Sequence, residues 1–285
     1  MIHSMTGYGK SELELQSKTI RLELKSLNSK SLDLNMRMPT MYRAKELELR
    51  RLIGAKLGRG KIDFSIYVEF NKGEAPAKIN TEVVKGYMKQ LESISSSDKV
   101  ELLKMAVRMP DAVSTEREDI DPKEWKIISD EVLVVLNKIQ NYRKDEGAVL
   151  EKDFSKRISK IDELLEEVIK IDPERIEHVR ERLNKGIAEL KEKVDENRFE
   201  QELIYYIEKL DITEEKIRLK NHLEYFLKNL NSNESNGKKL GFIGQEIGRE
   251  INTIGSKANY APMQKLVVQM KDELEKIKEQ LLNVL

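Results

Sequence analysis

The chain has 285 residues, with 51 basic and 51 acidic side chains, three histidines and no cysteine. The lack of cysteine excludes disulfide scaffolds, thiolate zinc sites, iron–sulfur clusters and cysteine nucleophiles. No apolar run approaches the roughly 20 residues needed to cross a bilayer, and the first residues lack the basic and apolar regions of a signal peptide. We therefore expect a cytoplasmic protein with no membrane span. Its formal net charge of zero leaves only local patches to attract a polyanion.

Residues 1–75 show the alternation of apolar and polar side chains that predicts strands with one buried face. The alternating runs lie at 20–25, 32–38 and 62–70. Between the last two runs, Leu49, Leu52 and Ile53 lie at helical spacing, and Gly58 follows where a helix would end. This first part of the chain is therefore predicted to be a small α+β domain.

The next segment, 76–120, is predicted to be a helical connector with breaks at Ser95–Asp98 and at Pro110. Beyond it, apolar side chains recur at spacings of three and four residues, which holds them on one face of a helix. These stripes are Phe154, Ile158, Ile161, Leu165 and Val168; Leu240, Ile243, Ile247, Ile251 and Ile254; and Met263, Leu266, Met270, Leu274, Ile277 and Leu281. The chain from residue 121 is thus predicted to be almost wholly helical.

A turn is predicted within this helical region, where Asp172 precedes Pro173. Two long helices joined there would form an antiparallel hairpin over 121–196. The remaining residues, 197–285, are predicted to be a C-terminal helical domain. The predicted fold class is α+β, with a small mixed strand and helix domain followed by a predominantly α-helical region.

A second stripe flanks the apolar face of the helix predicted near residue 250, and it carries Glu246, Glu250, Thr253 and Lys257. Two carboxylates one turn apart can hold a divalent cation together, because hard cations prefer oxygen ligands. The alternative is that both carboxylates are solvated or paired with Arg249 and Lys257, and spacing alone favours this alternative.

A similar edge on an upstream helix carries Glu215, Arg218 and His222. A histidine on the same face as a carboxylate suits a general base, or a metal ligand oriented by that carboxylate. The alternative is a boundary histidine hydrogen-bonded within the structure. Arg198 and Glu202, four residues apart, are explained equally well as an ordinary helix salt bridge.

One basic patch lies in the first domain, where Met41–Lys61 holds seven basic and two acidic residues, a local charge of seven minus two, or +5. Basic side chains on a helix and on the turn after it can follow a phosphate backbone. A solvated helix face explains the same charges equally well.

Several short motifs are spread over the N-terminal, central and C-terminal parts of the chain. The N-terminal motifs are Ser4-Met5-Thr6-Gly7-Tyr8-Gly9, Ser26-Leu27-Asn28-Ser29-Lys30-Ser31-Leu32-Asp33, Arg37-Met38-Pro39 and Arg59-Gly60-Lys61. The central motif is Arg143-Lys144-Asp145-Glu146-Gly147, followed by Leu150. The C-terminal motifs are Asn197-Arg198-Phe199-Glu200-Gln201-Glu202, Asp211-Ile212-Thr213-Glu214-Glu215 with Arg218-Leu219 and His222, and Gln245-Glu246 with Arg249-Glu250, Asn252-Thr253 and Ser256-Lys257. In this set and order the sequence resembles the YicC/YloC family.

The resemblance implies an endoribonuclease that requires a divalent cation, Mn²⁺ or Mg²⁺, and a homo-oligomer, a hexamer, that closes around its RNA. It places the metal and catalytic chemistry on the C-terminal motifs without giving each residue its role: Glu202, Glu215, His222, Glu246 and Glu250. Gly241 departs from the pattern, since many relatives carry an acidic residue there. Lys30 departs too, because it replaces an arginine and loses the planar two-point grip on phosphate.

The resulting hypothesis is metal-assisted hydrolysis of single-stranded or loop RNA. Its metal ligands would be Glu246, Glu250 and Glu202; its catalytic residues His222, Glu215 and Glu250; and its RNA-binding residues Lys30, Arg59, Lys61, Arg218, Arg249 and Lys257. One alternative is metal-independent transesterification, in which His222 deprotonates the ribose 2′-hydroxyl. The other is a non-catalytic RNA-binding or adaptor protein.

Overall fold

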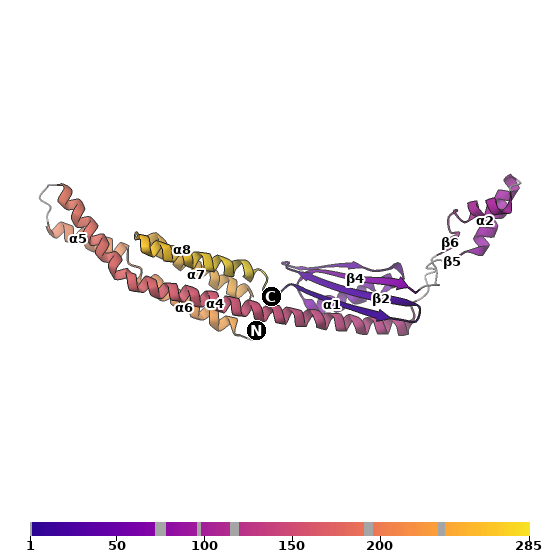
Figure 1. Cartoon of the computed structure of the whole chain (residues 1–285), viewed down its shortest axis with the longest axis horizontal. Helices are drawn as coiled ribbons and strands as arrows, with labels where there is room; N and C mark the ends of the chain where they lie inside the picture. Colours follow the sequence, from indigo (N-terminus) through magenta and orange to yellow (C-terminus); the bar gives the residue numbers. More distant parts are fainter. Residues whose placement is uncertain (1, 72–77, 96–97, 115–119, 191–195, 233–236) are drawn as a thin grey trace. The chain divides into compact units, whose positions relative to one another are not determined.

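A computed structural model describes residues 2–71, 78–95, 98–114, 120–190, 196–232 and 237–285 (Figure 1). The chain divides into two compact units, one of residues 8–140 and one of residues 1–7 together with 141–285. Strands and helices combine in an α+β fold, as predicted. Among the described helices, none has the length and apolar character to cross a membrane. The division of the chain into domains at 1–75, 76–120, 121–196 and 197–285 stays a prediction.

The unit of residues 8–140 is built on a four-stranded sheet of order β1-β2-β4-β3. Its strands are β1 (Gly7–Glu14), β2 (Lys18–Leu27), β3 (Leu32–Arg37) and β4 (Gly60–Phe70). β2 and β4 are antiparallel with Leu22 opposite Ile66, whereas β3 runs parallel to β4 with Leu34 opposite Ile62. The alternating runs predicted β2, β3 and β4. They did not predict β1, because its sequence, GYGKSELE, has no alternating apolar series.

Helices cover the buried face of this sheet. After a 3₁₀ turn at Thr40–Lys45, α1 (Glu46–Leu57) ends at Gly58, whose φ of 65° lies in the left-handed region that glycine adopts without strain. The buried core includes Ile20, Leu22 and Leu24 of β2, Ile62, Phe64 and Ile66 of β4, Leu49, Ile53 and Leu57 of α1, and Ile128, Val132 and Val135 of the following helix α4 (Pro122–Leu190). The small domain predicted from residues 1–75 therefore shares its core with the beginning of α4.

A smaller group of elements lies between β4 and α4 in sequence: β5 (Lys78–Ile79), α2 (Thr81–Ile94), α3 (Lys99–Ala106) and β6 (Val113–Ser114). It has its own small core of Val84, Ala106 and Ala112. The break predicted at Ser95–Asp98 is present, since α2 ends before it and the Asp98 side chain accepts a hydrogen bond from the Val100 amide at the start of α3.

Helix α4 (Pro122–Leu190) continues for 69 residues with Pro173 in its interior. The turn predicted at that proline, and with it the antiparallel hairpin, is therefore wrong. The physical reason is that the buried face stays in phase through the proline, because Asp172 is buried and both of its carboxylate oxygens are bound. Arg175 Nε lies 2.8 Å from Asp172 Oδ1, and Lys216 Nζ lies 2.7 Å from Asp172 Oδ2. These contacts hold the helix where proline removes one backbone hydrogen bond.

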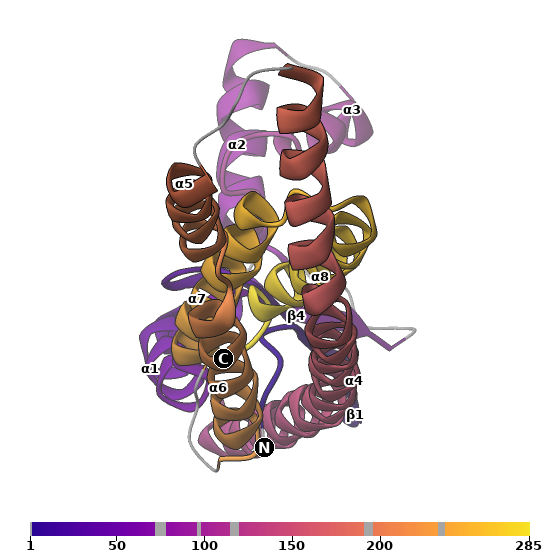
Figure 2. The same cartoon turned by 90° about the vertical axis from the view of Figure 1, so that its left-hand side faces the viewer.

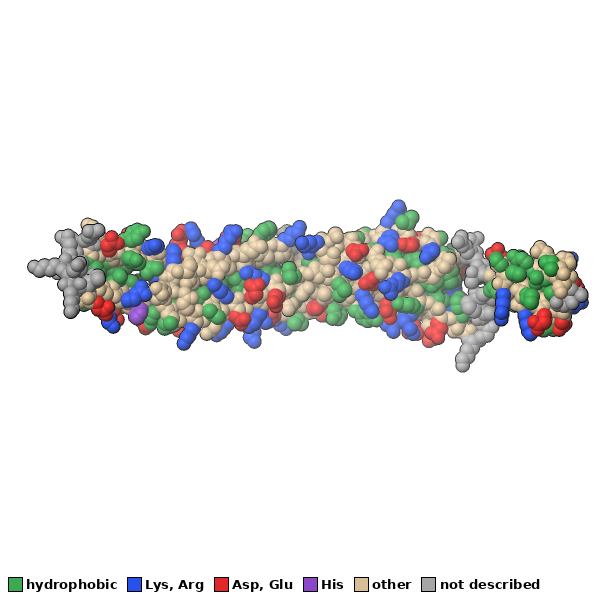
Figure 3. All heavy atoms as spheres, turned by 90° about the horizontal axis from the view of Figure 1, so that it is seen from above, with side chains coloured by type: hydrophobic (Ala, Val, Ile, Leu, Met, Phe, Trp, Pro, Cys, Tyr) green, Lys and Arg blue, Asp and Glu red, His purple; other side chains and the backbone are tan. Residues whose placement is uncertain are grey.

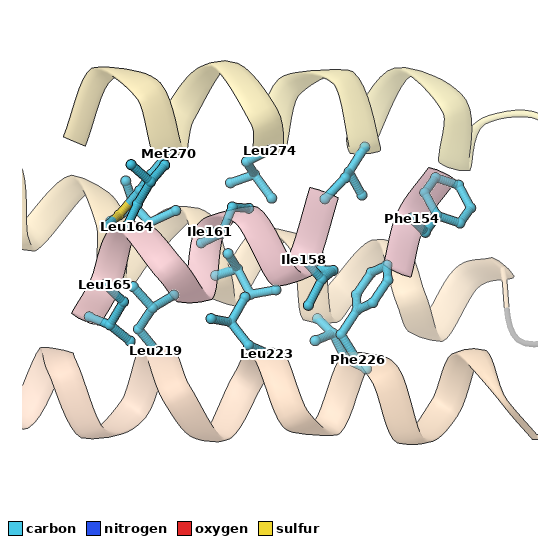
Figure 4. Packing of buried hydrophobic residues seen from close by; sticks show 14 of the residues in the cluster. Phe154, Ile158, Ile161, Leu164, Leu165, Leu219, Leu223, Phe226, Met270 and Leu274 are labelled. Carbon is cyan, nitrogen blue, oxygen red and sulfur yellow. The ribbon is translucent and has the colours of Figure 1, made fainter. Parts of the chain in front are cut away.

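The second unit packs four further helices with residues 141–190 of α4: α5 (Glu196–Lys209), α6 (Thr213–Leu230), α7 (Gly237–Lys257) and α8 (Ala261–Leu281). Figure 4 shows Ile158 and Ile161 of α4 between Leu223 of α6 and Leu274 of α8. The predicted apolar stripes of α4, α7 and α8 are buried here, except that Leu266 is only partly buried. Helices α6 and α7 lie side by side (Figures 1 and 2).

Within this unit, the N-terminal segment is hydrogen-bonded both to α4 and to the C-terminal end of the described chain. The Met5 amide donates to the Asn283 carbonyl over 2.7 Å, and the Ser4 amide donates to the Arg143 carbonyl over 3.0 Å. Thr6 Oγ1 donates to Glu146 Oε2. The N-terminal motif and the central Arg143–Gly147 motif therefore pack on one another, which the sequence did not indicate.

Candidate functional site

The candidate site lies along the two facing helices α6 and α7. They are antiparallel, because residues 231–236 connect one pair of ends while Lys257, at the end of α7, contacts Glu215, near the start of α6. Asp211 fixes the start of α6, since its carboxylate accepts hydrogen bonds from the amide and hydroxyl of Thr213. The hydroxyl bond is the main cause that lowers the pKa of Asp211.

The first pair of facing side chains is an ion pair. Lys257 Nζ lies 2.8 Å from Glu215 Oε1 and 2.8 Å from the Asp211 carbonyl oxygen. Glu215 is buried, and its other oxygen, Oε2, has no hydrogen-bond partner among the described residues. Sequence reasoning assigned Lys257 to RNA and Glu215 to the orientation of His222. In the structure, the lysine and the glutamate instead bind each other.

His222 and Glu250 form the second facing pair. His222 lies seven residues after Glu215 on α6, and Glu250 lies seven residues before Lys257 on α7. Seven residues return a helix to nearly the same face after about 10 Å of rise, so this spacing places His222 and Glu250 at about one level of the α6–α7 seam, the line along which the two helices pack. Both are half-buried, and neither makes a hydrogen bond or ion pair within the part of the chain that the structure describes.

Three of the other predicted site residues, Glu246, Arg249 and Arg218, are held in local ion pairs. Arg249 Nη1 lies 2.6 Å from Glu246 Oε1, and the Arg218 guanidinium pairs with Glu214. The alternative of a paired Glu246 therefore describes its state in this structure. Figure 3 shows the same tendency more widely, with basic and acidic side chains intermixed over the face that it displays. Such exposed pairs contribute little stability and can open toward a ligand.

Glu202 and its predicted partner Arg198 belong to α5. Glu202 is exposed, and no hydrogen bond or ion pair joins it to another described residue. The side chain of Arg198 lies outside the described residues. The structure therefore joins Glu202 neither to Arg198 nor to the other acidic residues of the set.

The donors available to a divalent cation are few. Within the described ranges, no three histidine, aspartate or glutamate side chains are grouped so as to hold a metal ion by themselves. Mg²⁺ does not need such a group, because one or two carboxylates suffice when water and substrate phosphates complete its coordination. The carboxylate of Glu250, unpaired among the described residues, offers oxygen ligands of the hard type that such an ion prefers, and Glu246 lies one turn away on the same helix. The donor chemistry fits a divalent cation shared with RNA.

Lys30, Arg59 and Lys61 are brought to one end of the sheet in the unit of residues 8–140. Arg59 Nε donates to the Ser29 carbonyl over 2.9 Å, and the next amide along the chain donates to the same loop over 3.3 Å. The loop that carries Lys30 is thus held against the turn that carries Arg59 and Lys61. Lys30 and Lys61 are exposed and have no ion-pair partner among the described residues, which makes them available to phosphate.

Sequence reasoning missed the buried charges that anchor α6. Asp172 and Arg175 of α4 are 6% and 2% exposed, and they connect to Lys216 of α6 and to the Lys257 carbonyl of α7. The one available signal was two charged residues at positions where the α4 apolar stripe continues in phase. This network joins α4, α6 and α7 near Glu215.

Comparisons with known proteins agree along the whole chain. Residues 2–152 match the family model described as endoribonuclease YicC-like, N-terminal region, and residues 168–285 match endoribonuclease YicC-like, C-terminal. The probable endoribonuclease YicC of Clostridioides difficile (strain 630) is 33% identical over 295 residues, and that of Haemophilus influenzae is 28% identical over 291 residues. Both alignments cover all of this chain and all of the relative. The chain belongs to the YicC-like endoribonuclease family.

We expect Lys257→Met to lower the free energy of unfolding by about 2 kcal/mol, because it leaves the Glu215 carboxylate buried without its counter-charge. The double variant Glu215→Gln/Lys257→Met should recover most of that loss. Denaturant unfolding of the two variants and the wild type measures both effects. A single variant that keeps full stability and loses RNA affinity would contradict the structural role of Lys257.

Proposed function

We propose that this chain is an endoribonuclease that cleaves single-stranded or loop RNA by divalent-metal-assisted hydrolysis of a phosphodiester bond. The observation that carries the proposal is that His222 and Glu250, neither of which has a hydrogen-bond or ion-pair partner among the described residues, lie on the adjacent antiparallel helices α6 and α7. Contacts of Lys216 with Asp172 and of Lys257 with Glu215 hold these two helices in register near the start of α6. Membership of the family supports the same reaction class.

Five residues of α6 and α7 have a defined task in this proposal. Glu250 holds the cation, with Glu246 as a second carboxylate once its exposed pair with Arg249 opens. When bound, the cation polarises a phosphoryl oxygen and lowers the pKa of water. His222 takes the proton from the attacking water, whose oxygen bonds to phosphorus as the bond to the leaving ribose oxygen breaks. Arg249, released from Glu246, and Arg218, released from Glu214, stabilise the charge on the phosphate.

The basic cluster of Lys30, Arg59 and Lys61 binds phosphates of the RNA. Lys257 has no RNA-binding task here, because its ammonium is bound to Glu215 and Asp211. A homo-oligomer of six copies stays a prediction from the family resemblance. Analytical ultracentrifugation can measure the number of copies.

The free imidazole of His222 also suits a second reaction, transesterification by the ribose 2′-hydroxyl. In that reaction His222 takes the 2′-proton, the 2′-oxygen bonds to phosphorus, and the 5′-oxygen leaves, which gives a 2′,3′-cyclic phosphate. No catalytic cation is required.

An assay of the products distinguishes these functions. Purified protein is incubated with single-stranded RNA in Mn²⁺, in Mg²⁺ or in chelator, and the new ends are identified by mass spectrometry. Hydrolysis predicts cleavage that stops in chelator and gives no cyclic phosphate. Cyclic ends that still form in chelator would replace it with transesterification. Protein that binds RNA but cleaves none under any condition would be an RNA-binding or adaptor protein.

A further inference from the structure

An aromatic and basic cluster lies at the end of the α6–α7 seam away from the Glu215–Lys257 pair, and the proposed function assigns it no task. Tyr225 of α6 is 44% exposed and Phe242 of α7 is 66% exposed. Lys239 Nζ lies 5.2 Å from the centre of the Tyr225 ring. Phe242 contributes little to the α7 core, which is formed by the buried leucine and isoleucines of its apolar stripe.

Helical spacing connects this cluster to the candidate catalytic pair on both helices. Side chains three or four residues apart are neighbours on a helix surface. On α6, Tyr225 therefore adjoins His222. On α7, Phe242 adjoins both Lys239 and Glu246, and Glu246 in turn adjoins Glu250. Along the α6–α7 seam, Tyr225 and Phe242 therefore lie within one or two helical turns of His222 and Glu250.

We propose that Tyr225, Phe242 and Lys239 form a stacking site for unpaired bases of the RNA, next to the bond that is cleaved. The inference rests on the proposed function and names the residues that would select its single-stranded substrate. Exposed rings offer faces to any base, and a neighbouring ammonium can bind the phosphate that precedes or follows it. Bases inside a duplex have no free face, so the site favours loops and single strands.

The test measures binding apart from cleavage, in the Glu250→Gln background, so that the probe is not consumed. The probes are a fluorescent single-stranded ribo-oligonucleotide, an abasic strand of the same length, and the first strand annealed to its complement. Phe242→Ala and Tyr225→Ala should each weaken binding of the base-bearing strand about tenfold, the effect of losing one stacked base, and leave the abasic strand unchanged. Lys239→Gln should weaken both single strands.

Tyr142→Ala is the matched control, because Tyr142 is an exposed tyrosine of α4, 49% accessible, and its removal should change no affinity. Equal losses for base-bearing and abasic strands would overturn the stacking site. So would unchanged RNA binding combined with a change in oligomeric state, which would make Phe242 a contact between copies. A wild type that cleaves nothing but keeps the base-dependent difference would overturn only the proposed function; an active wild type without that difference would overturn only this inference.

Discussion

Replacing Glu250 with glutamine should reduce RNA cleavage on the order of 10³-fold while RNA binding stays intact. Glutamine keeps the size of the side chain and removes the negative charge that would hold a divalent cation. Because Glu250 is half-buried and makes no hydrogen bond or ion pair within the described residues, its replacement breaks no structural contact. Cleavage rates under saturating Mn²⁺, with dissociation constants for RNA measured in parallel, test both halves of the expectation.

A matched control is available on α8. Glu275 is exposed and, within the described part of the chain, is paired only with Lys278, so Glu275→Gln should leave cleavage and folding unchanged. His222→Gln should also abolish cleavage if His222 moves the proton. Full activity of the Glu250 variant would remove that carboxylate from the mechanism. If the Glu250 variant bound RNA more weakly and also unfolded at a lower denaturant concentration, Glu250 would have a structural role instead.

The largest expected effect on stability comes from Gly147→Ala in α4. A Cβ at this position would lie 2.1 Å from the Ile2 carbonyl oxygen and 2.9 Å from its carbon, both backbone atoms. Since a backbone neighbour cannot rotate away, either the N-terminal segment or α4 must shift. The shift would strain the hydrogen bond between the Ser4 amide and the Arg143 carbonyl. We expect a loss of about 3 kcal/mol in the free energy of unfolding.

Gly186→Ala provides a control of the same chemistry in the same helix. Gly186 is exposed and has no neighbour within 4 Å of an added Cβ, so alanine should stabilise the protein by about 0.5–1 kcal/mol. The two variants are thus expected to shift the denaturation midpoint, followed by circular dichroism, in opposite directions. A Gly147 variant as stable as the wild type would contradict the close contact at Ile2.

Much of the fold could be predicted because apolar periodicity records burial directly. The alternation at 20–25 and 62–70 marked two central strands, and the stripes of α7 and α8 marked two packed helices. The rule that proline ends a helix failed at Pro173. There, tertiary contacts of Asp172 with a different helix outweigh the local preference, and no local pattern contains those partners.

The candidate site was predictable only to the level of one helix at a time. The Glu246–Arg249 pair could be named from its spacing, because both residues lie on α7. The Glu215–Lys257 pair could not, since it depends on the register between two helices. The seven-residue spacing had suggested that Glu215 orients His222. In the structure, Glu215 is bound to Lys257 instead.

The compact unit that contains α6 and α7 is discontinuous in sequence, so it cannot fold in the order in which its residues are synthesised. Residues 8–140 are consecutive and can collapse as soon as they leave the exit tunnel, whereas residues 1–7 belong with 141–285. The Met5 amide has its partner on Asn283. Met5 is therefore synthesised long before Asn283, the residue whose carbonyl accepts its amide hydrogen bond in the folded unit.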